Sequence, residues 1–160
     1  MDPKIFNNAV PVSILGMNKN PVAGLENASD VMLIGFFTGM RVEEICHLKV
    51  RDCRTGWFTI RDAKSEAEQR RDPIHTKLVA VVERRIEDKS DNEFLIHETK
   101  EDAATGRRSP DIMKQFYRHR DHAGADHRIE GRRGSLTDFH SLRRTFTTKA
   151  FQADINQDHC

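Results

Sequence analysis

The amino-acid sequence predicts a mainly α-helical domain with one small antiparallel sheet, an α+β fold. Two observations lead to this prediction. Apolar residues recur at helical spacing before residue 50 and again after residue 77. Strand-like segments are short and lie in the middle of the chain, where Trp57–Ile60 combines aromatic and β-branched residues behind a Thr-Gly turn.

The first helix should contain the most apolar run of the chain, Val31–Phe37. This run is apolar on all sides, which predicts a buried helix. Ser29 or Asp30 can act as its N-cap. The Thr-Gly pair at 38–39 should end the helix, and a second helix is expected from about residue 40 to residue 49.

The sheet is expected to be a single hairpin. Its first strand is Trp57–Ile60, with both aromatic residues packing in the hairpin core. A polar connection that contains Lys64 leads to a second strand around Asp72–His75, where Pro73 favours an edge position. Three further helices are expected over residues 78–88, from residue 109 onward, and from 137 or 138 to about 153.

The length is that of one domain or of part of one. Residues 1–28 are expected to be an irregular lead-in, and residues 29–160 to form the domain. No apolar run approaches the roughly 18 residues that a membrane span needs, and no secretory signal is visible. The three cysteines have no CxxC spacing, so we expect a reduced, cytoplasmic protein without a disulfide framework or a Cys-type zinc site.

Charge is unevenly distributed, although the formal net charge is only +1. Residues 107–150 hold 11 Lys and Arg against 5 Asp and Glu. Such a basic face fits an anionic partner, and a solvated arginine-rich surface is the plainer alternative. Three histidines of this block match no standard metal template: His119, His122 and His127. A DNA-facing loop is therefore expected there rather than a metal site.

One arginine is expected on the apolar side of the second helix. At about 100° per residue, Arg41 falls inside the buried arc, and Glu44 follows three residues later and within reach. A buried arginine is costly unless it is paired. Two interpretations stay open: a structural Arg41–Glu44 ion pair, or an arginine that Glu44 holds toward an anion.

The last helix should place His140 and Arg143 on one flank of its apolar stripe and Arg144 toward solvent. An arginine can bind phosphate oxygens through two parallel hydrogen bonds, and a histidine can move a proton near neutral pH. By itself, however, the His-x-x-Arg spacing is common by chance. A lone lysine in a hairpin turn, such as Lys64, is nearly always solvated.

Three segments together carry a family resemblance. Thr38–Ile45 resembles the first arginine box of the tyrosine recombinases, the phage integrase family. Trp57–Ile74 is similar to the β-hairpin of that family with its catalytic lysine, and Phe139–Phe146 is similar to its His-x-x-Arg box. The boxes occur in the order of the family and cover about residues 31–155, so the resemblance implies a tyrosine-recombinase catalytic domain.

The resemblance implies site-specific DNA recombination or integration, as carried out by phages and mobile elements. Arg41 and Arg143 would hold the oxygens of the scissile phosphate. Lys64 would protonate the leaving 5′ oxygen, and His140 would carry a proton or bind the phosphate. Glu44 would orient its neighbours. Further DNA contacts are expected from three arginines, Arg132, Arg133 and Arg144. The family reaction uses no metal or other cofactor, and the expected partners are double-stranded DNA and further copies of the chain on that DNA.

The chain also departs from the pattern of the family. The nucleophilic tyrosine of the family follows the His-x-x-Arg helix, whereas this sequence stops at Cys160 without one. Its only tyrosine, Tyr117, is expected to pack in the core and not to be the nucleophile. We therefore expect a catalytic domain that was cut short and does not cleave DNA by itself. The alternative is a non-catalytic, DNA-binding remnant of an integrase.

Overall fold

The computed structural model describes residues 26–61, 70–131 and 134–152. Within these residues helices dominate, and one two-stranded antiparallel sheet is present, which confirms the predicted fold class. Most of the predicted lead-in lies outside the described residues. None of the described helices is both long enough and apolar enough to cross a membrane.

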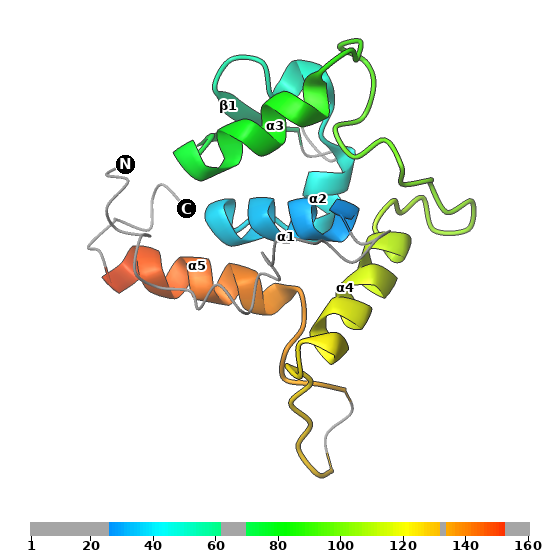
Figure 1. Cartoon of the computed structure of the whole chain (residues 1–160), viewed down its shortest axis with the longest axis vertical. Helices are drawn as coiled ribbons and strands as arrows, with labels where there is room; N and C mark the ends of the chain where they lie inside the picture. The colour runs from blue at the N-terminus through cyan, green and yellow to red at the C-terminus, as the bar shows by residue number, and fades with distance from the viewer. Residues whose placement is uncertain (1–25, 62–69, 132–133, 153–160) are drawn as a thin grey trace.

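The elements surround one central helix, α1 (Glu26–Thr38), which contacts α2, α4, α5 and η4. Figure 1 shows α1 in the middle, with α5 along one side and α3 along the other. The other elements, in chain order, are α2 (Val42–His47), the 3-10 turn η2 (Val50–Asp52), β1 (Trp57–Ile60), β2 (Arg70–Pro73), the 3-10 turn η4 (Thr76–Leu78), α3 (Val79–Ile86), α4 (Pro110–His122) and α5 (His140–Gln152).

The central helix is buried along nearly its whole length, as its sequence predicts. Residues 30–38 are all buried, because a helix that is apolar on every side needs neighbours all round. Gly35 provides room for one of these neighbours: a Cβ atom there would lie 3.0 Å from two ring carbons of Phe139. The close approach of the segment that leads into α5 therefore depends on a glycine in α1.

Asp30 has a different role from the predicted one. Helix α1 begins four residues earlier, so Asp30 lies inside the helix, where it is 4% exposed and does not cap it. Its carboxylate accepts hydrogen bonds from Arg85 Nε at 2.6 Å and from Arg84 Nη2 at 2.8 Å. Arg85 is equally buried and also donates to Asn27 Oδ1 and Glu98 Oε1. This network joins α3 to α1.

The hairpin has the predicted first strand and a shifted second strand. β2 begins and ends two residues before the predicted strand, because His75 is already the N-cap of η4 and accepts a hydrogen bond from the Lys77 backbone N–H. Phe58 is fully buried, as predicted. Trp57 is 44% exposed, so the prediction that it packs in the core is wrong. Adjacent strand residues point to opposite faces, and only one face of the hairpin meets the core.

Both ends of the second predicted helix lie inside the expected range. At its C-terminal end Leu48 already has an extended backbone (φ −58°, ψ 133°), and its carbonyl oxygen accepts a hydrogen bond from Leu95 N at 2.8 Å. The last two helices begin close to the predicted positions. Before α5, Asp138 Oδ1 accepts a hydrogen bond from Ser141 N at 2.8 Å, as an N-cap side chain does.

The only tyrosine of the sequence does not pack in the core. Tyr117 lies on α4 beside the buried Phe116, and its side chain is on a surface face with 41% of its area exposed. Its ring meets the Phe116 ring edge-on at 5.8 Å, and the Arg120 guanidinium carbon lies 5.1 Å from its centroid. The predicted packing of Tyr117 is therefore wrong, because the apolar stripe of α4 is narrower than expected.

The α1–α3 ion pair should dominate the stability of this half of the fold. Asp30→Ala leaves the Arg85 guanidinium buried without its carboxylate, which should lower the free energy of unfolding by about 3–5 kcal/mol. Asp111→Ala is the control, because its ion pair with Lys114 is exposed and should contribute no more than about 1 kcal/mol. Urea denaturation of both variants measures the difference. Equal losses would mean that the buried pair is not needed for stability.

Candidate functional site

Arg41 lies directly before α2 and is exposed to solvent. Its backbone is extended (φ −70°, ψ 147°), and 67% of its side chain is accessible. The predicted placement on the buried side of a helix is wrong, because α2 begins only at Val42 and the helical angle does not apply to Arg41. The guanidinium group is therefore accessible to a ligand from solvent.

Glu44 fixes Arg41 through two contacts. Its Oε2 accepts a hydrogen bond from the Arg41 backbone N–H at 2.8 Å, and its Oε1 lies 3.5 Å from Arg41 Nη1. A glutamate in the third helical position that reaches back in this way satisfies a backbone N–H that the helix leaves unpaired. The same carboxylate thus stabilises the start of α2 and restrains the arginine beside it.

The turn between α1 and α2 brings α5 to this place. Thr38 Oγ1 donates to Ile34 O at 2.7 Å and accepts from Met40 N at 3.1 Å, which shapes the turn. Gly39 has a positive φ of 68°, a conformation that glycine adopts without strain. Its carbonyl oxygen accepts a hydrogen bond from Arg143 Nη1 at 2.6 Å. The half-buried Arg143 therefore contacts the chain two residues before Arg41.

The bond to Gly39 orients Arg143 without exhausting its donors. A guanidinium group carries five N–H donors in a planar fork. One nitrogen of Arg143 is committed to the turn carbonyl, and the planar group is thereby held in one orientation on α5. An arginine that is fixed in this way can still bind an anion through its remaining N–H groups.

Two residues of β2, Arg70 and Asp72, belong to the same neighbourhood, although the sequence did not single them out. They pair in register with Ile60 and Phe58, which are buried, so both charged residues lie on the inward face of the hairpin. Arg70 Nε donates to both carboxylate oxygens of Asp72 at 3.1 Å, and Arg70 Nη2 lies 3.5 Å from Glu44 Oε2. The signal in the sequence is their spacing: strand residues two positions apart point to the same face, and these two lie opposite the apolar residues of the first strand.

The charges of this cluster act on one another. Burial raises the pKa of Asp72, and the opposing positive charges of Arg70 and Arg143 do not fully reverse this shift. The negative charge of Glu44 acts in the same direction as burial. The electrostatics thus join α2, β2 and α5 around the Asp72 carboxylate. Three guanidinium groups, those of Arg41, Arg70 and Arg143, stand against two carboxylates, which leaves one net positive charge.

The remaining predicted site residues are less closely joined to this cluster. His140 is the first residue of α5 and is exposed. Arg144 is exposed, as predicted, and donates to Leu136 O at 3.2 Å and to Ser141 Oγ at 2.8 Å, so it braces the start of α5. Three predicted residues, Lys64, Arg132 and Arg133, lie outside the described residues.

Glu43, the neighbour of Glu44 on α2, binds the segment before α4. Its carboxylate accepts hydrogen bonds from the backbone N–H groups of Arg108 at 2.6 Å and Ser109 at 3.2 Å. Burial alone would raise the pKa of Glu43, but its hydrogen bonds with Ser109 and Arg108 outweigh burial and the pKa is lowered. The carboxylate therefore fixes the two residues that precede α4, and sequence reasoning had assigned it no such role.

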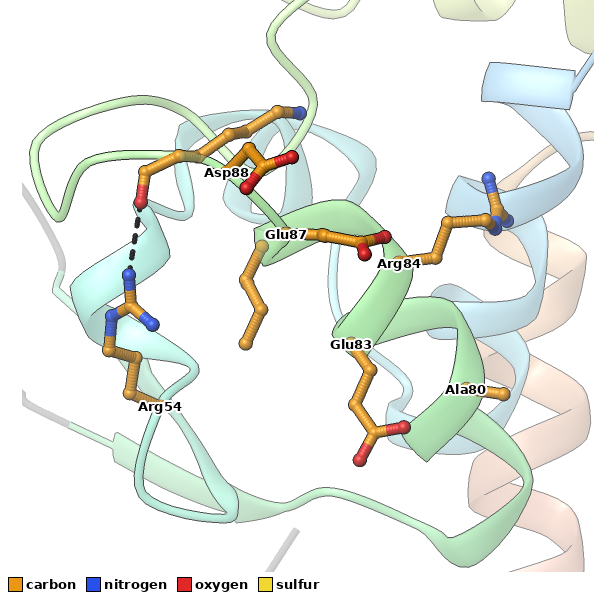
Figure 2. Close-up of a pocket in the computed structure, with 8 residues that line it drawn as sticks. Arg54, Ala80, Glu83, Arg84, Glu87 and Asp88 are labelled. Atoms are coloured by element: carbon orange, nitrogen blue, oxygen red, sulfur yellow. Dashed lines mark hydrogen bonds between the residues drawn. The ribbon is translucent and has the colours of Figure 1, made fainter.

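The surface depression beside α3 does not favour an anion. The surface depression beside α3 in Figure 2 is lined by side chains of both signs, including Arg54, Glu83 and Glu87. Arg54 Nη2 is already bound to the Lys89 carbonyl oxygen at 3.0 Å and its Nε to Asp91. None of the predicted site residues lines this depression.

The described ranges contain neither a cluster of metal ligands nor a reactive thiol. Among residues 26–61, 70–131 and 134–152, no group of three or more His, Cys, Asp or Glu side chains could hold a metal ion. Two of the three histidines of the basic block lie beside hydroxyl groups. His119 Nε2 is 3.3 Å from Ser29 Oγ, and His127 Nδ1 is 3.4 Å from Thr137 Oγ1. Burial raises the pKa of the buried thiols Cys46 and Cys53 to about 12, which keeps both protonated.

One comparison with known proteins gave a match. The family model of the phage integrase family matches residues 14–159. No curated protein and no solved structure gave a match. The matched range includes every element from α1 to α5 and therefore all the contacts described above.

The turn that holds Arg143 should not tolerate a side chain at Gly39. A Cβ atom there would lie 2.6 Å from Phe146 Cδ1. Gly39→Ala should therefore cost about 1–2 kcal/mol of unfolding free energy for the positive φ and about 1–3 kcal/mol more for the overlap. Gly56→Ala is the matched control, because Gly56 has a φ of +78° and a Cβ there meets nothing within 4 Å. Equal losses in thermal or urea denaturation would mean that Phe146 does not constrain the turn.

Proposed function

Because the chain belongs to the phage integrase family, the tyrosine recombinases, we propose that it acts in site-specific DNA recombination and binds the scissile phosphate between Arg41 and Arg143. The observation that carries this proposal is the hydrogen bond from Arg143 to the Gly39 carbonyl oxygen. It joins residues 104 positions apart and brings α5 to the chain next to Arg41. The single net positive charge of the surrounding cluster suits one phosphodiester, which carries one negative charge.

In this proposal the two arginines stabilise the transition state. Negative charge accumulates on the non-bridging oxygens when phosphorus becomes pentacoordinate, and two fixed guanidinium groups offset that charge without a metal ion. Glu44 keeps Arg41 in place, and Gly39 keeps Arg143 in place. By family resemblance, Lys64 protonates the leaving 5′ oxygen and His140 carries a proton or binds the phosphate.

The connection between α4 and α5 supplies a second DNA contact in this proposal. Figure 1 shows that this connection extends away from the helices. Its two sides are joined by a β-bridge between Arg128 and Ser135, and its base is held by Arg120, which donates to Thr137 O and contacts Asp126. Basic side chains on such an extension can reach the DNA backbone phosphates. The arginines proposed for DNA contacts here are Arg132 and Arg133, which belong to this connection by sequence, and Arg144, which lies on α5 and binds the segment before it.

A second candidate function is DNA binding without strand cleavage. The observation that favours it is the position of the only tyrosine of the sequence, Tyr117, which lies on α4 against Phe116 and Arg120. No contact links Tyr117 to the cluster of Arg41, Glu44 and Arg143 among the described residues. In that case the same arginines would bind a phosphate that is not broken.

DNA affinity should depend on the two central arginines more than on their neighbour. Arg41→Ala and Arg143→Ala should each weaken binding of a short duplex by roughly tenfold or more, because each removes charge-assisted hydrogen bonds to one phosphate. Arg144→Ala is the comparison, since Arg144 is proposed as a peripheral DNA contact and its exposed guanidinium group is bound to the loop before α5, so its loss should weaken binding less. Fluorescence anisotropy at one fixed salt concentration measures all three variants. Equal effects would show a plain basic surface instead of a phosphate site.

The 160-residue chain should form no covalent complex with DNA. A suicide duplex, which traps the phosphotyrosyl intermediate of a recombinase, should bind without yielding an adduct, because Tyr117 is the only tyrosine and lies on α4. Denaturing electrophoresis with labelled DNA detects an adduct, and anisotropy on the same samples verifies binding. An adduct that disappears in Tyr117→Phe would overturn this expectation and assign Tyr117 as the nucleophile.

A further inference from the structure

The carboxylate of Asp72 lies in a cluster of arginines that we propose to bind phosphate. We infer that Asp72 sets the affinity of this site: it acts as an internal anion that offsets part of the positive charge and weakens phosphodiester binding at neutral pH. This inference rests on the proposed function, because it concerns the same arginines. It adds a residue of β2 to the site and gives its binding a pH dependence.

The geometry holds Asp72 in this position. Its register partner in the hairpin is the fully buried Phe58, so Asp72 is on the inward face, and only 16% of its side chain is exposed. Both carboxylate oxygens accept hydrogen bonds from Arg70 Nε at 3.1 Å. The carboxylate therefore cannot turn into solvent without giving up this bifurcated hydrogen bond.

The charges that face Asp72 come from three elements. Arg70 lies on β2, Glu44 on α2 and Arg143 on α5. Arg70 also lies 3.5 Å from Glu44 Oε2, the oxygen that accepts the Arg41 backbone N–H. Asp72 is thus connected to the restraint on Arg41 through Arg70 and Glu44, and to Arg143 by direct attraction. A phosphate that enters between the two arginines must approach this negative charge.

The size of the effect follows from Coulomb's law. Two like charges about 4 Å apart that water screens fully repel by an energy that corresponds to roughly a threefold to tenfold change in affinity. The pH dependence has a definite sign. Burial raises the pKa of Asp72, so this carboxyl takes up a proton at a higher pH than an ordinary aspartate does. Protonation removes the repulsion, and DNA affinity should rise as the pH falls through this range.

The test compares Asp72→Asn with Asp72→Glu at neutral pH. Asparagine keeps the size and one acceptor oxygen for Arg70 but removes the charge, so a short DNA duplex should bind roughly threefold to tenfold more tightly. Glutamate keeps the charge and should give no tightening. The matched control is Asp91→Asn, because Asp91 also accepts a hydrogen bond from an arginine Nε, that of Arg54, at 2.6 Å. This control should change affinity by less than about twofold.

A second measurement separates charge from packing. The affinity ratio between Asp72→Asn and the unchanged protein should fall toward one as the pH is lowered through the pKa of Asp72, whereas a packing defect would give a ratio independent of pH. Thermal denaturation verifies that each variant is folded under the binding conditions.

The outcomes distinguish this inference from the proposed function. If Asp72→Asn binds no more tightly than the unchanged protein while Arg41→Ala and Arg143→Ala weaken binding, the role of Asp72 is overturned and the phosphate site stands. If the two arginine variants bind as the unchanged protein does, the proposed phosphate site itself fails.

Discussion

The burial of α1 on all sides is the constraint on which the rest of the structure depends. A helix without a polar face has to be enclosed, and here α2, α4, α5 and η4 all contact it. The end of α1 is therefore fixed in the middle of the molecule, and the turn at Gly39 emerges there. Because Arg41 follows this turn and Arg143 is bonded to it, the position of the proposed phosphate site is a consequence of core packing.

Local sequence signals predicted the elements well and the cluster only in part. The apolar run of α1, the strand Trp57–Ile60 and the proline at the start of α4 identify their elements directly. The Arg41–Glu44 contact follows from their spacing, whichever element begins there. By contrast, the bond between Arg143 and Gly39 joins positions 104 residues apart, and only the assembled fold reveals it.

Two predictions failed for the same physical reason. In each case the start of a helix depends on which partner a charged side chain binds. Arg41 was expected inside a helix, but the Glu44 side chain pairs with its backbone N–H and makes it the residue before the helix. Asp30 was one of two residues expected to cap α1, but Arg84 and the buried Arg85 on α3 bind its carboxylate instead. In both cases the hydrogen bonds of a charged side chain decided the outcome, and helical periodicity does not predict such bonds.

The two adjacent glutamates of α2 bind different segments of the chain. Glu44 reaches back to the residue before the helix, and Glu43 reaches across to the backbone N–H groups of the two residues before α4. A helix of only six residues is thus clamped at two points about 100° apart around its axis. A one-residue insertion or deletion between Arg41 and Glu43 would change the spacing that brings the Glu44 carboxylate back to the Arg41 N–H, and would turn the helix so that the two carboxylates could not both keep their partners. The length of this short segment is therefore more constrained than the identity of its exposed side chains.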